Sequence, residues 1–188
     1  MRTDIQLIFK ALDLASTRHK NQHRKGKTKT PYINHPIKVA SILVNEGGES
    51  DLVLIISAVL HDVVEDTVSN EQEMIELKNQ ISTEFGNEVL RVVEEVSDDK
   101  SLRKEERKRL QVEHAPLISD LAKKIKLADK ISNLREIVSD PPMPWTNERI
   151  HEYLSWAENV VSGLRGLNVS LEMAFDKSLA ECRKKYGC

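Results

Sequence analysis

The sequence predicts an all-α protein, a single domain built as a helical bundle, and three observations lead to this prediction. Apolar residues recur every three or four positions along most of the chain, which is the spacing of amphipathic helices. Only 7 glycines and 4% aromatic residues are present, whereas all-β folds need more turn residues and more aromatics. The 188 residues, 39% of them hydrophobic, suffice for one domain with one core. We expect about eight to ten helices.

Nine stretches carry this helical spacing in turn. They cover residues 4–20, 35–46, 52–67, 70–85, 87–97, 103–114, 117–138, 146–163 and 168–186. The first places Ile5, Ile8 and Leu12 on one face, as a helix packed on a core requires. The third opens with an uncharged apolar run, residues 52–60, and should therefore be deeply buried. The sixth is so highly charged that we expect most of its surface to face solvent.

Residues with special backbone behaviour separate these stretches. Asn34 can cap the second helix, and Pro36 suits its first turn. Gly86 stops the fourth helix, and Pro116 ends the sixth. The strongest break is the run Pro141-Pro142-Met143-Pro144, which we interpret as a connection between helices within one domain.

Composition narrows the class of protein. The net charge of −2 gives no sign of general nucleic-acid binding. Cys182 and Cys188 form neither a disulfide framework nor a zinc-finger spacing, which fits a reducing compartment. Neither a signal-like amino terminus nor a membrane-spanning apolar run is present. We therefore expect a cytoplasmic protein that binds neither membranes nor nucleic acids and is a monomer or a weak homodimer.

The segment from His61 to Asp66 concentrates reactive side chains at the end of the third helix. In a continuous helix, His61 would lie one turn before Glu65, and Asp62 one turn before Asp66. Three carboxylates so close together are costly unless a cation neutralises them or their pKa values separate. A bound metal ion is the simplest solution, and a helix that merely reaches solvent here is the alternative.

A basic run, residues 24–29, contains four positive charges and no acid. It is either an exposed loop or a site that attracts a polyanionic substrate, and its position directly before His35 favours the second interpretation. We expect His19 and His23, which lack carboxylate neighbours in the sequence, to be solvated.

The seventh stretch places Asp129 and Asn133 on one helix face, close to apolar neighbours. A carboxylate in such surroundings needs a partner, either a metal ion or a salt bridge to Lys126 or Lys130. In the eighth stretch Tyr153 could reach a ligand, although packing is the simpler role for it.

Four of these side chains, taken together, predict a metal site on three helices: His35, His61, Asp62 and Asp129. Imidazole and carboxylate ligands without thiolate suit manganese, iron or zinc. Such an ion lowers the pKa of a bound water and stabilises charge on phosphorus, while Glu65 and Asp66 could orient the water or move its proton. These components predict hydrolysis of a phosphoester or a pyrophosphate.

Three short sequence motifs point to a particular protein family: PYINHP, VLHDVVEDT and KLADKISNLR. They resemble the hydrolase domain of the Rel/SpoT enzymes, which belong to the HD superfamily of metal-dependent phosphohydrolases. The resemblance is strongest to the stand-alone small alarmone hydrolases, including the metazoan SpoT homologue. It extends through EEVSDDKSLRKEERKRLQVEHAP and EYLSWAENVVSGLRG. We therefore expect residues 1–188 to be one HD-type domain, without the synthetase and regulatory domains of the long enzymes.

The resemblance implies a role for each matched residue. It makes His35, His61, Asp62 and Asp129 the ligands of one divalent ion, usually Mn²⁺. It makes Glu65 and Asp66 the acidic pair that acts on the attacking water. It places Arg24, Lys25 and Asn133 against the nucleotide. The implied reaction removes pyrophosphate from the 3′ position of guanosine 3′,5′-bis(diphosphate) (ppGpp), yielding GDP.

Two other functions use the same residues. One is removal of the 2′-phosphate of NADPH, which has been linked to metazoan relatives and would need the same metal site. The other is a non-catalytic nucleotide sensor, which the intact acidic and metal positions disfavour. One position departs from the family: Lys29 stands where members often carry glycine, which should change the flexibility and charge of the loop.

Overall fold

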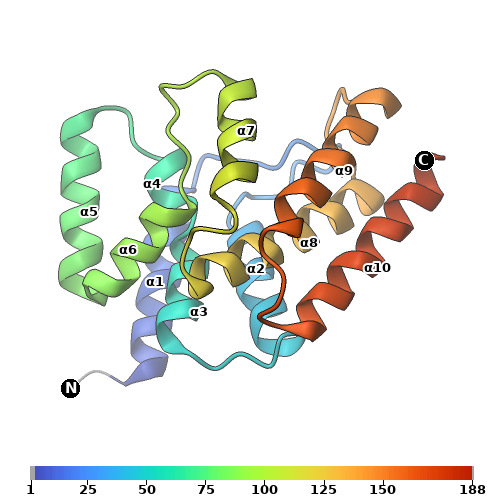
Figure 1. The fold of residues 1–188 in the computed structure, drawn as a ribbon. Helices are drawn as coiled ribbons and strands as arrows, with labels where there is room; N and C mark the ends of the chain where they lie inside the picture. The colour runs from blue at the N-terminus through green and yellow to red at the C-terminus, as the bar shows by residue number, and fades with distance from the viewer. Residues whose placement is uncertain (1–2, 188) are drawn as a thin grey trace.

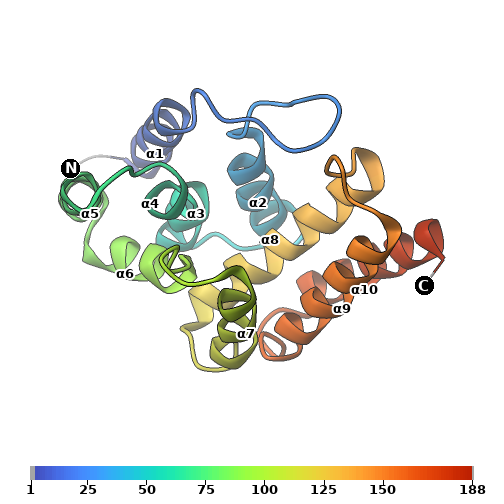
Figure 2. The same cartoon turned by 90° about the horizontal axis from the view of Figure 1, so that it is seen from above.

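A long central helix, α8 (Asp120–Ser139), organises the structure. The computed structural model describes residues 3–187. Figures 1 and 2 show α8 crossing the middle of the molecule, with other helices on both sides. The helices that pack against it are α2 (Asn34–Asn45), α3 (Leu52–Leu60), α6 (Asn87–Val96), α9 (Asn147–Ser162) and α10 (Val169–Tyr186). Residues that lie far apart in the sequence therefore meet along one rod.

The remaining helices form an outer layer. Helix α1 (Asp4–Arg18) packs on α3, and α5 (Glu71–Phe85) packs on α6 and on the single turn α4 (Val63–Asp66). Helix α7 (Lys104–His114) lies against α9. Residues 3–187 thus form ten helices and contain no strand, so the prediction of an all-α bundle is confirmed. Cys188 lies outside the described residues.

The core follows from the apolar faces of these helices. Helix α8 buries residues on most of its circumference, because it has neighbours all round. Helix α7 buries none of its residues, as its charge predicted. Cys182 on α10 is fully buried and its Sγ donates to the carbonyl oxygen of Leu134 at 3.1 Å. None of the helices in residues 3–187 combines the length and the hydropathy that a bilayer crossing requires.

The expected continuous helix over residues 52–67 is wrong at one point. Helix α3 ends at Leu60, and α4 begins at Val63. The Nδ1 atom of His61 lies 2.8 Å from the carbonyl oxygen of Ala58, the acceptor that the Asp62 amide would use in an unbroken helix. The side chain thus competes with the backbone, and the helix breaks where the reactive residues begin.

Two smaller expectations are also wrong. Asn34 does not cap α2, because the chain enters this helix through a tight turn in which the His35 amide donates to the carbonyl of Tyr32 at 2.8 Å. His19 is only 1% exposed, whereas His23 is exposed as expected. The His19 ring stacks on Tyr32, with ring centroids 4.9 Å apart, and its Nδ1 lies 2.6 Å from Oε1 of Gln22.

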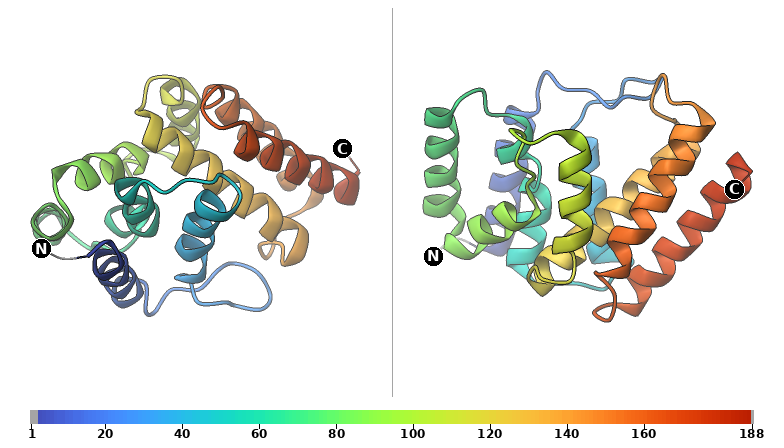
Figure 3. Two further views of the ribbon diagram at one scale, coloured as in Figure 1. Left: turned by 90° about the horizontal axis from the view of Figure 1, so that it is seen from below. Right: turned by 45° about the horizontal axis from the view of Figure 1, so that its top comes forward.

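The basic loop, residues 24–31, is held by hydrogen bonds at its base and at its tip. At its base the Arg24 amide donates to the carbonyl of Thr30 at 2.9 Å. At its tip the Lys27 amide donates to Asp140 Oδ1 at 2.8 Å, and Thr28 donates to the other carboxylate oxygen. Gly26 packs so closely on Asp140 that a Cβ atom would clash. Figure 3 shows the resulting bridge between the α1–α2 loop and the α8–α9 connection.

Lys29 adopts a backbone conformation that favours glycine. Its φ of +49° makes it the one non-glycine residue with positive φ among residues 3–187. A side chain in this region costs about 1–2 kcal/mol. The position at which family members often carry glycine is therefore one where glycine fits better.

We predict that Lys29→Gly stabilises the protein by about 0.5–1 kcal/mol. The relief of backbone strain exceeds the loss from the greater freedom of glycine in the unfolded chain, which is about 0.4–1 kcal/mol. Chemical denaturation measures the change. Lys27→Gly is the control, because Lys27 has no positive φ and the same exchange there should destabilise. A lower free energy of unfolding for Lys29→Gly would contradict the interpretation.

Candidate active site

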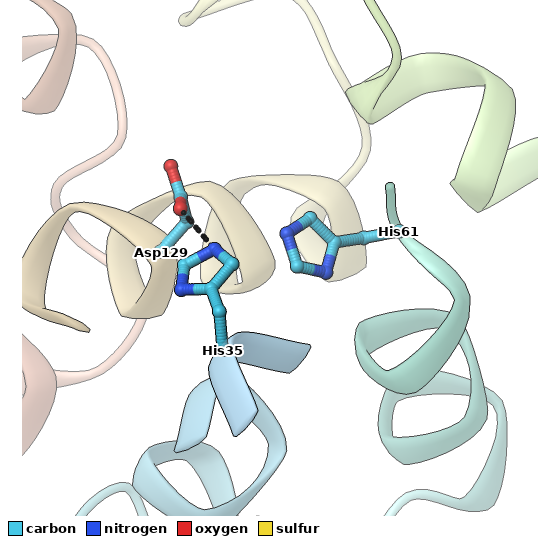
Figure 4. Close-up of side chains that lie close together, drawn as sticks. All are labelled: His35, His61 and Asp129. Carbon is cyan, nitrogen blue, oxygen red and sulfur yellow. Dashed lines mark ion pairs between the residues drawn. The ribbon is translucent and has the colours of Figure 1, made fainter. Parts of the chain in front are cut away.

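Three helices direct side chains into one cavity of about 190 Å³. His35 comes from the first turn of α2, His61 from the end of α3 and Asp129 from the middle of α8 (Figure 4). One nitrogen or oxygen atom from each lies within 4.8 Å of the other two, a spacing that could hold a metal ion. Asp62 Oδ2 lies 3.1 Å from His61 Nε2 and 3.8 Å from His35 Nε2. Three of the four predicted metal ligands thus meet the spacing of a metal site, and the fourth, Asp62, lies beside both histidines; the four are called the metal-ligand cluster below.

The hydrogen-bond partners of the two imidazoles orient each ring so that its Nε2 atom could bind a metal ion. The Ala58 carbonyl can only accept, so Nδ1 of neutral His61 carries the proton and Nε2 presents its lone pair to the cavity. This Nε2 is buried and makes no well-formed hydrogen bond. Nδ1 of His35 lies 3.2 Å from Ser132 Oγ, which leaves Nε2 facing Asp129 at 3.1 Å. Such outer partners orient ligating histidines in metal sites.

The charges of the site are strongly coupled. Burial opposes ionisation, but His61 holds the pKa of Asp62 well below its usual range, and Lys130 does the same for Asp129. Burial lowers the pKa of His35. Burial also acts to lower the pKa of His61, yet the Asp62 carboxylate outweighs it and raises that pKa to about 9. Without a metal ion, a proton on His61 therefore compensates the carboxylates, and a divalent cation would replace it.

The acidic pair lies beside this cluster in the same cavity. Burial raises the pKa of Glu65 to about 7, and its Oε2 accepts the Asp98 amide at 2.9 Å. Asp66 pairs with Lys100. The hydroxyl of Tyr32 lies 2.8 Å from Asp62 Oδ2 and 3.1 Å from Asp66 Oδ2, so it links the acidic pair to the metal-ligand cluster.

A larger cavity of about 490 Å³ adjoins the first. The two share Arg24, Tyr32, Asp66 and Asn133 in their walls. Lys25 lines the larger cavity, so all three residues predicted to contact a nucleotide lie around it.

Arg24 is held firmly in this wall. Its Nε donates to Glu136 Oε2 at 2.8 Å and its Nη2 to Asn133 Oδ1 at 2.6 Å. Asn133 in turn donates to Asp129 Oδ1 at 2.7 Å, which connects the basic residue to the metal-ligand cluster. The Arg24 guanidinium also lies 5.2 Å from the centre of the Tyr32 ring.

Sequence reasoning missed several residues of the site. Ser132 and Glu136 follow Asp129 and Asn133 at a spacing of three, so the helical period of α8 could have placed them on the same face. Of the two salt bridges considered for Asp129, the one to Lys130 forms, at 2.8 Å. Tyr32 is missed for a different reason, since its contacts depend on the fold of the basic loop.

Tyr153 packs against aromatic neighbours, as the simpler of its two expected roles requires. Its ring packs between Trp145 and Trp156, with centroid distances of 5.4 and 5.3 Å. Tyr153 and Trp145 also line the larger cavity. Aromatic rings at this position offer a surface on which a nucleobase could stack.

Comparisons with known proteins agree with this geometry. The HD domain family model matches residues 11–155. The guanosine-3′,5′-bis(diphosphate) 3′-pyrophosphohydrolase MESH1 of Xenopus tropicalis is 49% identical over 176 residues, which cover 94% of each chain. The protein of the same name from Homo sapiens is 48% identical over 174 residues, or 93% of each chain.

A solved structure points to the same family. It is a metazoan orthologue of SpoT that is described as hydrolysing ppGpp and playing a role in starvation responses. It superposes with a TM-score of 0.86 and 42% identity over 96% of each chain. The resemblance to the Rel/SpoT hydrolase domains is thus confirmed, and the chain belongs to the HD domain family.

Proposed function

We propose that this protein hydrolyses ppGpp to GDP and pyrophosphate and that it uses one Mn²⁺ ion. The observation that carries the proposal is the meeting of His35, Asp62 and Asp129 with the buried Nε2 of His61, directly beside two further carboxylates. The activity for which the relatives at 48–49% identity are named supports the same substrate. That residues 1–188 form one domain, monomeric or weakly dimeric, stays a prediction.

The donor set supports the choice of metal. Two imidazoles and two carboxylates, without thiolate, are more typical of a site for a first-row ion such as Mn²⁺ than of a structural zinc site. When bound, the ion would supply a Lewis acid that makes water a nucleophile at neutral pH and stabilises the charge on phosphorus. Ser132 and the Ala58 carbonyl would keep the two imidazoles in the orientation that binding requires.

The acidic pair would handle the proton of the attacking water. With its pKa near 7, Glu65 is suited to accept a proton at neutral pH, and the Asp98 amide holds its carboxylate in place. Asp66 is fixed by Lys100 and by the Tyr32 hydroxyl, so it can orient the water without being free to turn away.

The larger cavity would hold the nucleoside and its 5′-diphosphate. Its volume of about 490 Å³ lies within the range of small-molecule sites. Arg24 and Lys25 would neutralise phosphate charge at its wall, and Asn133 would contact the ribose between the two cavities. A phosphate or pyrophosphate on the 3′ oxygen then points toward the metal ligands.

Turnover assays test the proposal. The purified protein is incubated with Mn²⁺ and either ppGpp or NADPH, and the released pyrophosphate and orthophosphate are measured separately. We expect pyrophosphate from ppGpp in equal amount with GDP, and none after chelation of the metal. Orthophosphate from NADPH at a higher kcat/KM would favour the 2′-phosphatase instead. Binding of ppGpp without turnover would favour the nucleotide sensor.

We predict that the double variant Glu65→Gln, Asp66→Asn loses turnover by a factor of about 10²–10⁴, because general acid–base catalysis contributes that much. Both substitutions keep the size of the side chain and leave the four metal ligands in place. Isothermal titration with Mn²⁺ should therefore give nearly unchanged affinity. Wild-type turnover in the double variant would refute the assigned role.

A further prediction concerns the residue behind His35. Ser132→Ala should weaken Mn²⁺ binding about 10- to 100-fold, since outer partners of ligating histidines contribute that much to metal affinity. The matched control is Ser57→Ala, which removes an equally buried hydroxyl that has no hydrogen-bond partner. If both variants bind Mn²⁺ equally well, Ser132 does not orient the ligand.

A further inference from the structure

The smaller cavity has two distinct ends. At one end it shares wall residues such as Tyr32 and Asn133 with the larger cavity, which is proposed to hold the nucleoside. The residues that line only the smaller of these two cavities include Val96, Gln111 and Lys126. A group attached to the 3′ oxygen would enter from the shared wall, pass the predicted metal ligands and extend toward this other end.

Lys126 is a cation without a carboxylate partner at that end. It lies on α8 one turn before Asp129, and its Nζ donates to the carbonyl oxygen of Val96 at 3.1 Å. Among residues 3–187 no acidic group lies within 4.0 Å of this Nζ, whereas Nζ of Lys130 pairs with Asp129 at 2.8 Å. An ammonium group has three N–H donors, so two donors of Lys126 remain available for a ligand. Burial lowers its pKa, and a nearby anion would offset that effect.

The space continues beyond Lys126. A third cavity, of about 220 Å³, lies under α7 and shares Asp98, Gln111 and Lys126 with the smaller cavity. In the shared wall, Asp98 Oδ2 accepts from the Gln111 amide at 2.6 Å. The Nε atom of Arg107 in the same cavity is buried without a hydrogen-bond partner. A second phosphate therefore has room at this end, where Lys126 and Arg107 supply positive charge beside the carboxylates of Glu95, Asp98 and Asp99.

We propose that Lys126 binds the outer phosphate of the 3′-pyrophosphoryl group and makes the site selective for pyrophosphoryl over monophosphoryl esters. This inference rests on the proposed function. In the hydrolysis, an oxygen from water forms a bond to the inner phosphorus while the bond from that phosphorus to O3′ breaks. The O3′ atom takes up a proton, and pyrophosphate leaves with its outer phosphate on Lys126. A monophosphoryl ester has no outer phosphate to contact Lys126.

The test compares two substrates that differ only in this outer phosphate, ppGpp and guanosine 5′-diphosphate 3′-monophosphate. Lys126→Met should lower kcat/KM for ppGpp about 10- to 100-fold, the effect of one hydrogen bond to a charged group. It should change kcat/KM for the monophosphate less than about twofold, and Lys126→Arg should restore part of the loss. Lys123→Met is the matched control, because this lysine lies one turn earlier on α8 and lines none of the three cavities described above.

Binding measurements separate this inference from the proposed function. By isothermal titration, Lys126→Met should weaken inorganic pyrophosphate binding at least about tenfold, leave orthophosphate binding unchanged and keep wild-type Mn²⁺ affinity. This holds even if neither guanosine ester is turned over. Equal losses on both substrates, or equal affinity of the wild type and Lys126→Met for pyrophosphate, would overturn the proposal. So would a loss of Mn²⁺ affinity, which would assign Lys126 a structural role.

Discussion

The structure depends on the electrostatic balance around the buried pair of His61 and Asp62. Carboxylates from α8 and from the α3–α4 segment share a small cavity with two imidazoles, and such groups are stable together only if positive charge is supplied. In the protein alone that charge comes from a proton on His61 and from the ammonium of Lys130. The same arrangement makes a divalent cation favourable, because the cation would supply the positive charge that the proton otherwise provides.

Helix α8 sets the distances within the site. Lys126, Asp129 and Asn133 follow one another at spacings of three and four on one face, and Glu136 continues the series. One straight element thus lines the smaller cavity, the shared wall and the larger cavity in that order. Helix α8 is held rigidly because five helices pack against it, namely α2, α3, α6, α9 and α10. A site built on such an element can hold its geometry to fractions of an ångström.

The sequence predicted the helices well because their periodicity is a property of each segment by itself. It also drew attention to His35, His61 and Asp129, which the structure brings together, since polar groups on apolar helices are conspicuous against that pattern. It did not predict the break after Leu60, which arises because one imidazole competes for a backbone carbonyl. Nor could it place the hydroxyl of Tyr32, because its position depends on a loop whose anchor, Asp140, lies more than a hundred residues away. Contacts of this kind are decided by tertiary structure.

Arg24 is already ordered in the protein alone. Its Nε and Nη2 groups are taken up by Glu136 and Asn133, and these contacts fix the plane of the guanidinium against the Tyr32 ring. Within residues 3–187 its Nη1 group makes no hydrogen bond to the protein, so the N–H donors on that side of the guanidinium are available to a ligand. A phosphate binding there would not have to immobilise a long side chain, so less conformational entropy is lost. In the proposed function the acidic partner of Arg24 would therefore assist anion binding, because it orders the cation before the substrate arrives.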